Sequence, residues 1–295
     1  MQIREIASVV ANWGSVVGCS EVRGGHTSTT FRVETKLPNG DKWQLFVKCN
    51  SANFEPNFRC EFDGLDRLAA VNALRIPKPL KIETIGDRAF LVMEWIEPSG
   101  QSDFDLFGRQ LANLHRQTHC HRNGLDQDSH LGASPQINTP LNDWVEFVQH
   151  NRIGAQLRRA VANDLIDIPC KRDIEAIIES MSLLLAGRAS GTSLLHGDLW
   201  SGNYLFDPNN QPVVIDPAVY YGCREAEFGM ILLYGGCPQS FYAAYNEQWP
   251  LPAGWRERCK VYVLYHLLNH LNLFGTSYLG QCKQLIHEIL NKPGM

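Results

Sequence analysis

The sequence predicts an α+β protein of two lobes, a small β-rich lobe over residues 1–97 and a larger helical lobe over residues 98–295. Two patterns predict this division. Residues 20 to 96 alternate between apolar and polar side chains, as half-buried strands do. Residues 103 to 290 instead repeat apolar side chains every three to four positions, which is typical of amphipathic helices. We find no internal repeat in the sequence that would indicate a solenoid.

The small lobe is expected to contain a hairpin, a helix and a buried strand. Strand-like runs at Thr29–Thr35 and Trp43–Cys49 flank the turn formers Pro38–Asp41. Alternation on both sides of such a turn indicates a β-hairpin. A helix should follow over about Asn57–Asn72, because its apolar residues share one face. The apolar run Ala89–Trp95 then predicts a strand.

The larger lobe is expected to be mostly helical. A short strand pair at about 203 to 216, turning at Asp207–Pro212, interrupts the helical pattern. The polar stretch His121–Pro140 is the longest segment without a pattern, and long ordered loops are often functional. The expected helices cover Phe104–Thr118, Trp144–Ala162, Arg172–Leu185, Arg224–Leu233 and a long run from Trp255.

Composition excludes several classes of function. A net charge of −4 gives no broad attraction to nucleic acid or to an acidic membrane. The N-terminus lacks the apolar core of a signal peptide, and no apolar run reaches the roughly 18 residues of a membrane-spanning helix. Nine cysteines without C-x-x-C spacing suggest neither a disulfide framework nor a zinc ribbon. We expect a cytoplasmic monomer with reduced thiols, without nucleic acid or membrane partners.

The most informative motif is the run His196–Asn203, followed by Asp216 at the end of an apolar strand. Phosphoryl transfer needs a carboxylate, here Asp198, to take up or orient the proton of an attacking hydroxyl. The amide oxygen of Asn203 and the carboxylate of Asp216 are hard ligands for the Mg²⁺ that bridges ATP phosphates. The spacing H-x-D-x-x-x-x-N matches the catalytic loop of kinase-like phosphotransferases. The alternative is two unrelated polar turns.

The small lobe offers candidate groups for binding ATP. Lys48 ends an apolar strand, where a kinase places the lysine that contacts the α- and β-phosphates. Glu61, on the following helix, is the best candidate partner for Lys48, with Glu55 as a less regular competitor. Gly24 and Gly25 precede a strand and could bring backbone N–H groups against phosphates, although a glycine pair usually marks a turn.

The lobe connection and the catalytic loop add further candidates. The connection offers backbone donors and acceptors to adenine, and its candidate residues are Glu94, Trp95, Ile96 and Glu97. Three aromatic residues near the catalytic groups suit a sugar or an alkyl amine, or belong equally to the core; these are Trp200, Tyr220 and Tyr221. The segment Arg224–Glu227 either holds charged groups of the catalytic loop or forms a charge pair at a helix N-terminus.

The motifs favour a small-molecule kinase over a protein kinase. Gly197, not arginine, follows His196, so the cation that would engage a phosphorylated activation loop is missing. Pro217 follows Asp216 where protein kinases carry phenylalanine, and no Ala-Pro-Glu follows. We therefore expect a small acceptor molecule.

The sequence resembles the fructosamine kinase family, also called ketosamine-3-kinases, in its bacterial form. His-Gly-Asp is also shared with aminoglycoside and choline phosphotransferases, but the longer motifs are much narrower. The resemblance covers about Gly24 to Gly275, and its segments are Phe46–Asn50, Pro135–Asn138, Leu195–Asn203, Asp216–Glu225 and Tyr265–Gly275.

This resemblance implies a protein-kinase-like bilobal fold and ATP-dependent phosphorylation of the C3 hydroxyl of a ketosamine, as a small molecule or on glycated lysine, as a first step of deglycation. It implies that Asp198 is the catalytic base, that Asn203 and Asp216 bind Mg²⁺, and that Lys48 and Glu61 place ATP. Two departures are a phosphate loop, Gly24-Gly25-His26-Thr27, that is poor in glycine, and Glu227-Phe-Gly where relatives more often carry Asp-Leu-Ala. An aminoglycoside- or choline-type phosphotransferase and an inactive nucleotide-binding protein are the alternatives.

Overall fold

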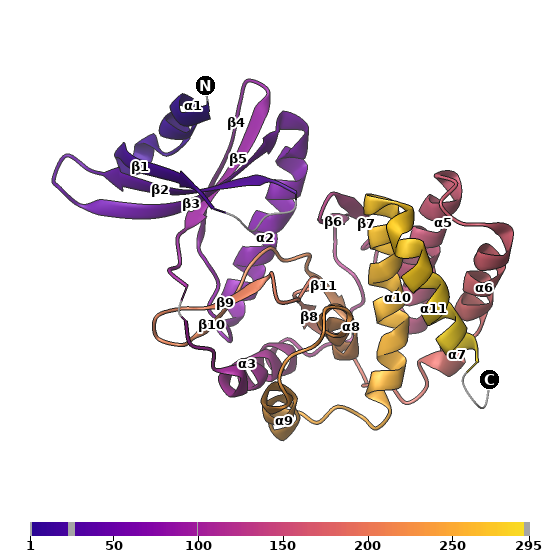
Figure 1. The fold of residues 1–295 in the computed structure, drawn as a ribbon. Helices are drawn as coiled ribbons and strands as arrows, with labels where there is room; N and C mark the ends of the chain where they lie inside the picture. Colours follow the sequence, from indigo (N-terminus) through magenta and orange to yellow (C-terminus); the bar gives the residue numbers. More distant parts are fainter. Residues whose placement is uncertain (1, 23–26, 99, 292–295) are drawn as a thin grey trace. The chain divides into compact units, whose positions relative to one another are not determined.

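The computed structural model describes residues 2–22, 27–98 and 100–291, which form two compact units (Figure 1). The first comprises Met1–Asp103 with Gly202–Pro217, and the second comprises Phe104–Ser201 with Ala218–Met295. The division expected from the sequence kept residues 202–217 in the larger lobe. They join the first unit because the strand Pro212–Val214 bridges to Arg75.

The first unit is built on a five-stranded antiparallel sheet in the order β1-β2-β3-β5-β4. The expected hairpin is confirmed as β2 and β3, and the expected helix as α2. The strands β9 and β10 form a separate antiparallel pair. The bounds are α1 Gln2–Val9, β1 Ser15–Glu21, β2 Thr29–Lys36, β3 Lys42–Ser51, α2 Glu55–Val71, β4 Pro79–Ile85, β5 Arg88–Glu94, β9 Tyr204–Phe206 and β10 Pro212–Val214.

The alternation of β3 gives the sheet two different faces. Leu45, Val47 and Cys49 are buried in an apolar cluster that also contains Ile6 and Val9 of α1. Successive side chains of a strand point to opposite faces. The intervening residues of β3, among them the lysine at position 48, therefore face away from this cluster. One face of the sheet thus forms a core with α1, and the other is available for a site.

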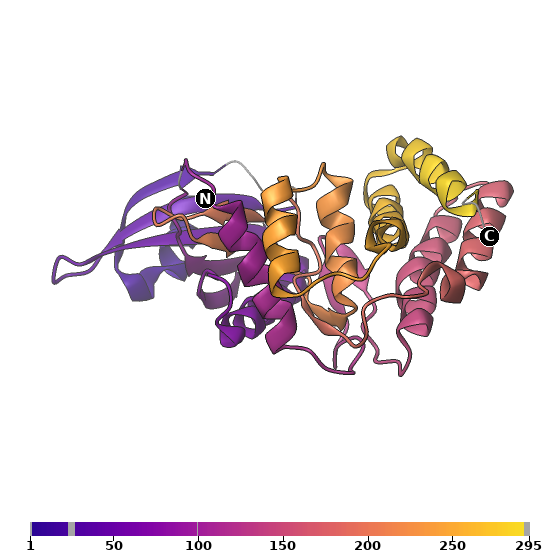
Figure 2. The same cartoon turned by 90° about the horizontal axis from the view of Figure 1, so that it is seen from below.

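The second unit is mainly helical (Figure 2). The helix expected from residue 255 ends at Phe274, because Gly275 takes a φ of +83° that the helix cannot continue through. α10 and α11 lie side by side in both views (Figures 1 and 2). The bounds are α3 Phe104–Gln117, α4 Trp144–Phe147, α5 Gly154–Ala162, α6 Ile168–Glu179, α7 Met181–Leu184, α8 Glu227–Leu233, α9 Gln239–Gln248, α10 Trp255–Phe274 and α11 Leu279–Leu290.

Short strands and irregular turns complete the second unit. The polar stretch expected to be irregular contains a strand pair, β6 Ser129–Leu131 with β7 Ser134–Gln136. β8 Ser193–Leu195 pairs with β11 Tyr220–Gly222, and this pair brackets the catalytic motif in the sequence. Between α4 and α5 lies a π-helical turn, Val148–Ile153. Across the residues that the structure describes, we find no helix whose length and hydropathy would carry it through a bilayer.

Candidate active site

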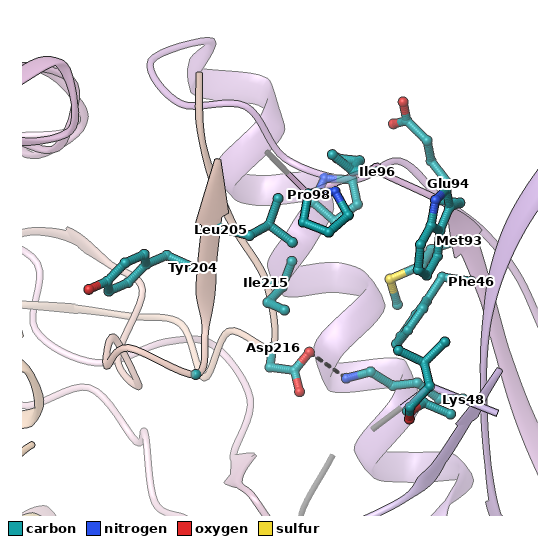
Figure 3. A pocket seen from close by; sticks show the side chains of 15 residues that line it. Phe46, Lys48, Met93, Glu94, Ile96, Pro98, Tyr204, Leu205, Ile215 and Asp216 are labelled. Carbon is teal, nitrogen blue, oxygen red and sulfur yellow. Dashed lines mark hydrogen bonds and ion pairs between the residues drawn. The ribbon is translucent and has the colours of Figure 1, made fainter. Parts of the chain in front are cut away.

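Lys48 of β3 is the centre of an ion-pair network in the first unit. Its Nζ donates to Oε1 of Glu61 at 2.7 Å and to Oδ1 of Asp216 at 2.5 Å, the latter drawn in Figure 3. Burial alone would lower the pKa of Lys48, but the charges of Asp216 and Glu61 outweigh it and raise the pKa, so the side chain is an ammonium. Glu55, the competing partner, pairs instead with Arg59. The structure thus brings together three residues that the sequence analysis assigned to ATP and metal.

Glu61 is buried beside Lys48, and burial of its carboxylate is unfavourable. Burial raises the pKa of Glu61, the neighbouring Lys48 lowers it, and the nearby charge of Asp216 raises it again. Two carboxylates therefore compete for one buried cation. A site of this kind accepts a further cation readily, because a second positive charge would relieve the repulsion between Glu61 and Asp216.

The strand pair β9–β10 places the two candidate metal ligands. Asn203 directly precedes β9, and Asp216 lies two positions after the last residue of β10. The strands are antiparallel with Tyr204 opposite Val214, so these two ends meet. The N–H of Ile215 donates to the carbonyl of Asn203 at 3.0 Å, which closes the ladder. Asp216 has a φ of +55°, a left-handed conformation that costs free energy in a residue other than glycine and that recurs at active sites.

An apolar pocket of about 240 Å³ opens beside this network within the first unit. Figure 3 shows Lys48 and Asp216 at one end of the pocket and Ile96 and Pro98 at the other. An apolar pocket that ends in charged groups matches a nucleotide, whose base is largely apolar and whose phosphates are anionic. Most of the lining residues were not among the candidates expected from the sequence. They come from β2, β3, β5 and β9 and from the segments beside the strands: Val22, Thr30, Phe46, Pro77, Met93, Tyr204, Leu205 and Ile215.

The residues expected to contact adenine divide into two groups. Glu94, Trp95 and Ile96 line the pocket, whereas Glu97 is not among its lining residues. The carboxylate of Glu94 points away from Lys48 (Figure 3), because it pairs with Arg75 at 2.5 Å. The indole N–H of Trp95 donates to Glu97 at 2.9 Å. The carboxylate of Glu94 and the indole N–H of Trp95 are thus engaged with other side chains, whereas the side chain of Ile96 lines the pocket (Figure 3).

The glycine pair expected to grip the phosphates, Gly24 and Gly25, lies outside the described residues.

In the second unit, Glu227 holds the start of the catalytic motif. Its Oε2 accepts from the N–H of His196 at 2.6 Å, and its Oε1 accepts from the N–H of Gly197 at 3.0 Å. Burial would raise the pKa of Glu227, but hydrogen bonds and charge from His115 and His196 lower it, so a carboxylate is present. Of the segment Arg224–Glu227, Glu227 therefore supports the loop, and it does so by accepting from backbone N–H groups of the loop.

The backbone at Gly197 explains why glycine stands between His196 and the candidate catalytic residue Asp198. Its φ is +83°, and a Cβ at this position would lie 2.2 Å from the carbonyl oxygen of Ala218. The N–H of Ala218 in turn donates to the carbonyl of His196 at 2.8 Å. Glu227 on one side and Ala218 on the other thus fix the turn that carries Asp198.

The three aromatic candidates for substrate contact lie in different surroundings. Tyr220 is buried, with its ring stacked over Phe147 at 6.1 Å and under the guanidinium of Arg152 at 4.1 Å. Tyr221 faces Arg122, 5.6 Å from its ring centroid. Trp200 packs on a second ring at the surface, described below. Tyr220 thus belongs to the core, whereas Tyr221 and Trp200 are only half-buried and stay candidates for substrate contact.

Comparison with known proteins places these features in a family. A family model described as fructosamine kinase matches residues 2–292. The chloroplastic protein-ribulosamine 3-kinase of Oryza sativa subsp. japonica is 36% identical over 280 residues, which cover 93% of this chain and 79% of that protein. YniA of Escherichia coli strain K12, assigned as a ketoamine kinase, is 36% identical over 270 residues, 88% of this chain and 93% of that one.

Solved structures show the same relationship. A structure from Haemophilus somnus 129PT, assigned as a fructosamine-3-kinase, has a TM-score of 0.85 at 29% identity and covers 97% of each chain. The aminoglycoside phosphotransferase APH(4)-Ia, solved with ADP and hygromycin B, has a TM-score of 0.66 at 16% identity and covers all of each chain. At that identity the second likeness shows a shared fold alone. The expected α+β, protein-kinase-like fold is confirmed.

Proposed function

Because the chain belongs to the fructosamine kinase family, we propose that it transfers the γ-phosphoryl group of ATP to the C3 hydroxyl of a ketosamine. The observation that carries this proposal is the contact of the Lys48 ammonium with Glu61 and Asp216 at the end of an apolar pocket. A kinase uses such a lysine to hold ATP phosphates and such an aspartate to hold metal. The relatives named above supply the class of acceptor.

The protein groups that bind the nucleotide have distinct roles. The apolar walls of the pocket take the adenine ring, and Lys48 neutralises charge on the phosphates. Asn203 and Asp216 together offer one amide and one carboxylate oxygen, a donor set that suits Mg²⁺, which takes few protein ligands and completes its shell with phosphate and water. When bound there, the ion would supply charge that stabilises the transferring phosphoryl group.

Asp198 acts on the acceptor. We assign its carboxylate to orient the C3 hydroxyl and take up its proton as the O–P bond forms. A misplaced base loses much of its effect, so the support of the loop by Glu227 and Ala218 matters for rate as well as for folding.

The chemistry of the product suggests a role in deglycation. Phosphate on C3 sits one carbon from the C2 carbonyl, and enolisation across C1 and C2 makes the C3–O bond allylic. The nitrogen lone pair then expels inorganic phosphate, and water releases the original amine and a deoxy-dicarbonyl sugar. We infer that such a repair enzyme works in the cytoplasm, where ATP is supplied, as a monomer on free ketosamines or on glycated lysine.

The test uses ATP, Mg²⁺ and a panel of acceptors: fructosamine and ribulosamine on one common amine, an aminoglycoside and choline. A mass gain of one phosphate on a ketosamine, located on C3 by NMR, is the expected result. After removal of enzyme and ATP, free amine and phosphate should appear over hours. Phosphorylation of only the aminoglycoside or choline supports the alternative acceptor class, and no transfer to any acceptor supports an inactive nucleotide-binding protein. Asp198→Asn protein is the control for contaminating kinases.

A further inference from the structure

Five rings of the second unit form a continuous strip, which we call the aromatic strip: Trp200, Tyr234, His270, Phe274 and Tyr278. The ring centroids of Trp200 and Tyr234 are 4.9 Å apart, and those of Tyr234 and His270 are 5.9 Å apart. His270 then stacks on Phe274 at 5.6 Å and on Tyr278 at 5.1 Å, with interplanar angles of 21° and 19°. The Tyr234 hydroxyl and Nε2 of His270, 3.3 Å apart, share a hydrogen bond.

One end of the aromatic strip adjoins the catalytic carboxylate. Trp200 follows Asp198 by two residues in the motif. Burial raises the pKa of Tyr234 to about 12, and the Tyr278 hydroxyl and the negative charge of Asp198 contribute to this rise, which places the tyrosine within the field of the aspartate. The strip therefore begins with a ring two residues along the chain from the proposed base, and its second ring is close enough to respond to the charge of that base.

The other end of the aromatic strip is open to solvent. Phe274, at this end, is 51% exposed, and Tyr234, next to Trp200, is 40% exposed; both are among the exposed large apolar side chains of the described residues. Solvent-exposed rings that are already stacked lose little conformational entropy when they bind a ligand, and they are typical of recognition surfaces.

The proposed substrate has a matching shape and charge. With the C3 hydroxyl at Asp198, the C1 methylene and its nitrogen lie two and three bonds beyond C3. That nitrogen is a secondary amine and carries a positive charge near neutral pH. Aromatic faces attract such a cation, and they also bury the alkyl stem of a lysine.

We propose that the aromatic strip binds the amine-bearing side of the ketosamine, so that the enzyme favours sugars attached to a peptide lysine over the same sugars attached to a small amine. The inference rests on the proposed function and adds that the enzyme recognises the amine side of its substrate as well as the sugar. In this proposal Trp200, the ring nearest to Asp198 along the chain, contacts the substrate ammonium. Phe274 and Tyr278 contact the alkyl stem of the lysine and the neighbouring peptide group.

The experiment compares two acceptors that carry the same sugar. One is the ketosamine of methylamine, and the other is the ketosamine of the lysine side chain in a blocked Ala-Lys-Ala tripeptide. We expect the wild type to show the higher kcat/KM for the tripeptide. Phe274→Ala should lower the ratio of the two kcat/KM values roughly five- to tenfold, because one ring contact is lost from the larger acceptor only. Phe274→Tyr keeps the ring and should keep the ratio.

Leu183→Ala is the matched control, because Leu183 is a 58% exposed apolar residue of the same unit on α7, outside the aromatic strip. It should leave the ratio unchanged, and thermal unfolding of each variant checks that it is folded. Equal kcat/KM for both acceptors in the wild type, or an unchanged ratio in Phe274→Ala, overturns the inference while the proposed function stands. Phosphorylation of neither acceptor refutes the proposed function itself.

Discussion

Replacement of Glu227 by glutamine tests how the catalytic turn is held. The side chain is fully buried, and its two oxygens each accept a backbone N–H, one from His196 and one from Gly197. Glutamine has the same shape but only one acceptor oxygen. Its NH₂ group must therefore face one of the two N–H donors, and that donor loses its partner.

The expected loss of stability in Glu227→Gln follows from these contacts. A buried N–H without a partner costs about 1–3 kcal/mol. The remaining hydrogen bond loses its charge, and charge-assisted bonds are roughly twice as strong as neutral ones. Together we expect Glu227→Gln to lower the free energy of unfolding by about 2–4 kcal/mol, which a typical domain survives. The turnover number should fall roughly tenfold or more, because the turn carrying Asp198 is less well fixed.

The measurements are urea unfolding and kcat on a ketosamine, with Glu247→Gln, an exposed position on α9, as the control that should change neither. The pKa of Glu227 is lowered in the folded protein, so its contribution is present above the ordinary value of about 4.3 and is lost as the pH falls through the lower folded value. The stability gap between wild type and Glu227→Gln should therefore narrow below roughly pH 4. Wild-type stability and turnover in the variant at pH 7 would refute the reasoning.

Three further substitutions probe the proposed roles. Asp198→Asn should keep the fold and nucleotide affinity but lower kcat by roughly 10²- to 10⁴-fold, because an amide cannot take up the proton; near-normal kcat would remove Asp198 from catalysis. Asp216→Ala should weaken Mg²⁺-dependent ATP binding roughly a hundredfold in calorimetry, and an unchanged affinity with Mg²⁺ would contradict its role as a ligand. Gly197→Ala should lower the free energy of unfolding by about 2–5 kcal/mol through strain and the clash with Ala218, whereas Gly40→Ala, with φ of +97° and open space around it, should cost only about 1–2 kcal/mol.

The features predicted correctly from the sequence are those set by neighbours along the chain. The turn formers Pro38–Asp41 between alternating runs sufficed for the β2–β3 hairpin, which the structure confirms with Thr29 opposite Cys49. Apolar spacing sufficed for α2 and α3. The motif His196–Asn203 could be recognised because its residues follow one another along the chain at a fixed spacing. In each case the determining contacts are local.

The features that the sequence did not disclose depend on distant contacts. Glu227 looked like a departure within a helix, and only its burial beside two backbone N–H groups reveals what it does. The rings of Trp200 and His270 are 70 positions apart along the chain, and both contact the ring of Tyr234. For Glu227 the sequence nevertheless held an indication: an acid that begins the apolar run of α8 is expected to be buried, and a buried carboxylate needs hydrogen-bond donors.

The number of residues in the π-helical turn Val148–Ile153 determines where the guanidinium of Arg152 lies. Such a turn contains one residue more than an α-helical path would need. It delivers Arg152 to the rings of Phe147 and Tyr220, at 4.5 and 4.1 Å, and to the carbonyl of Ile137 at 2.6 Å. Removal of one residue would restore a regular helix and rotate everything beyond it by about 100°. Either the guanidinium or the buried face of α5 would then be misplaced, so this segment should tolerate exchange of its exposed residues far better than any change in their number.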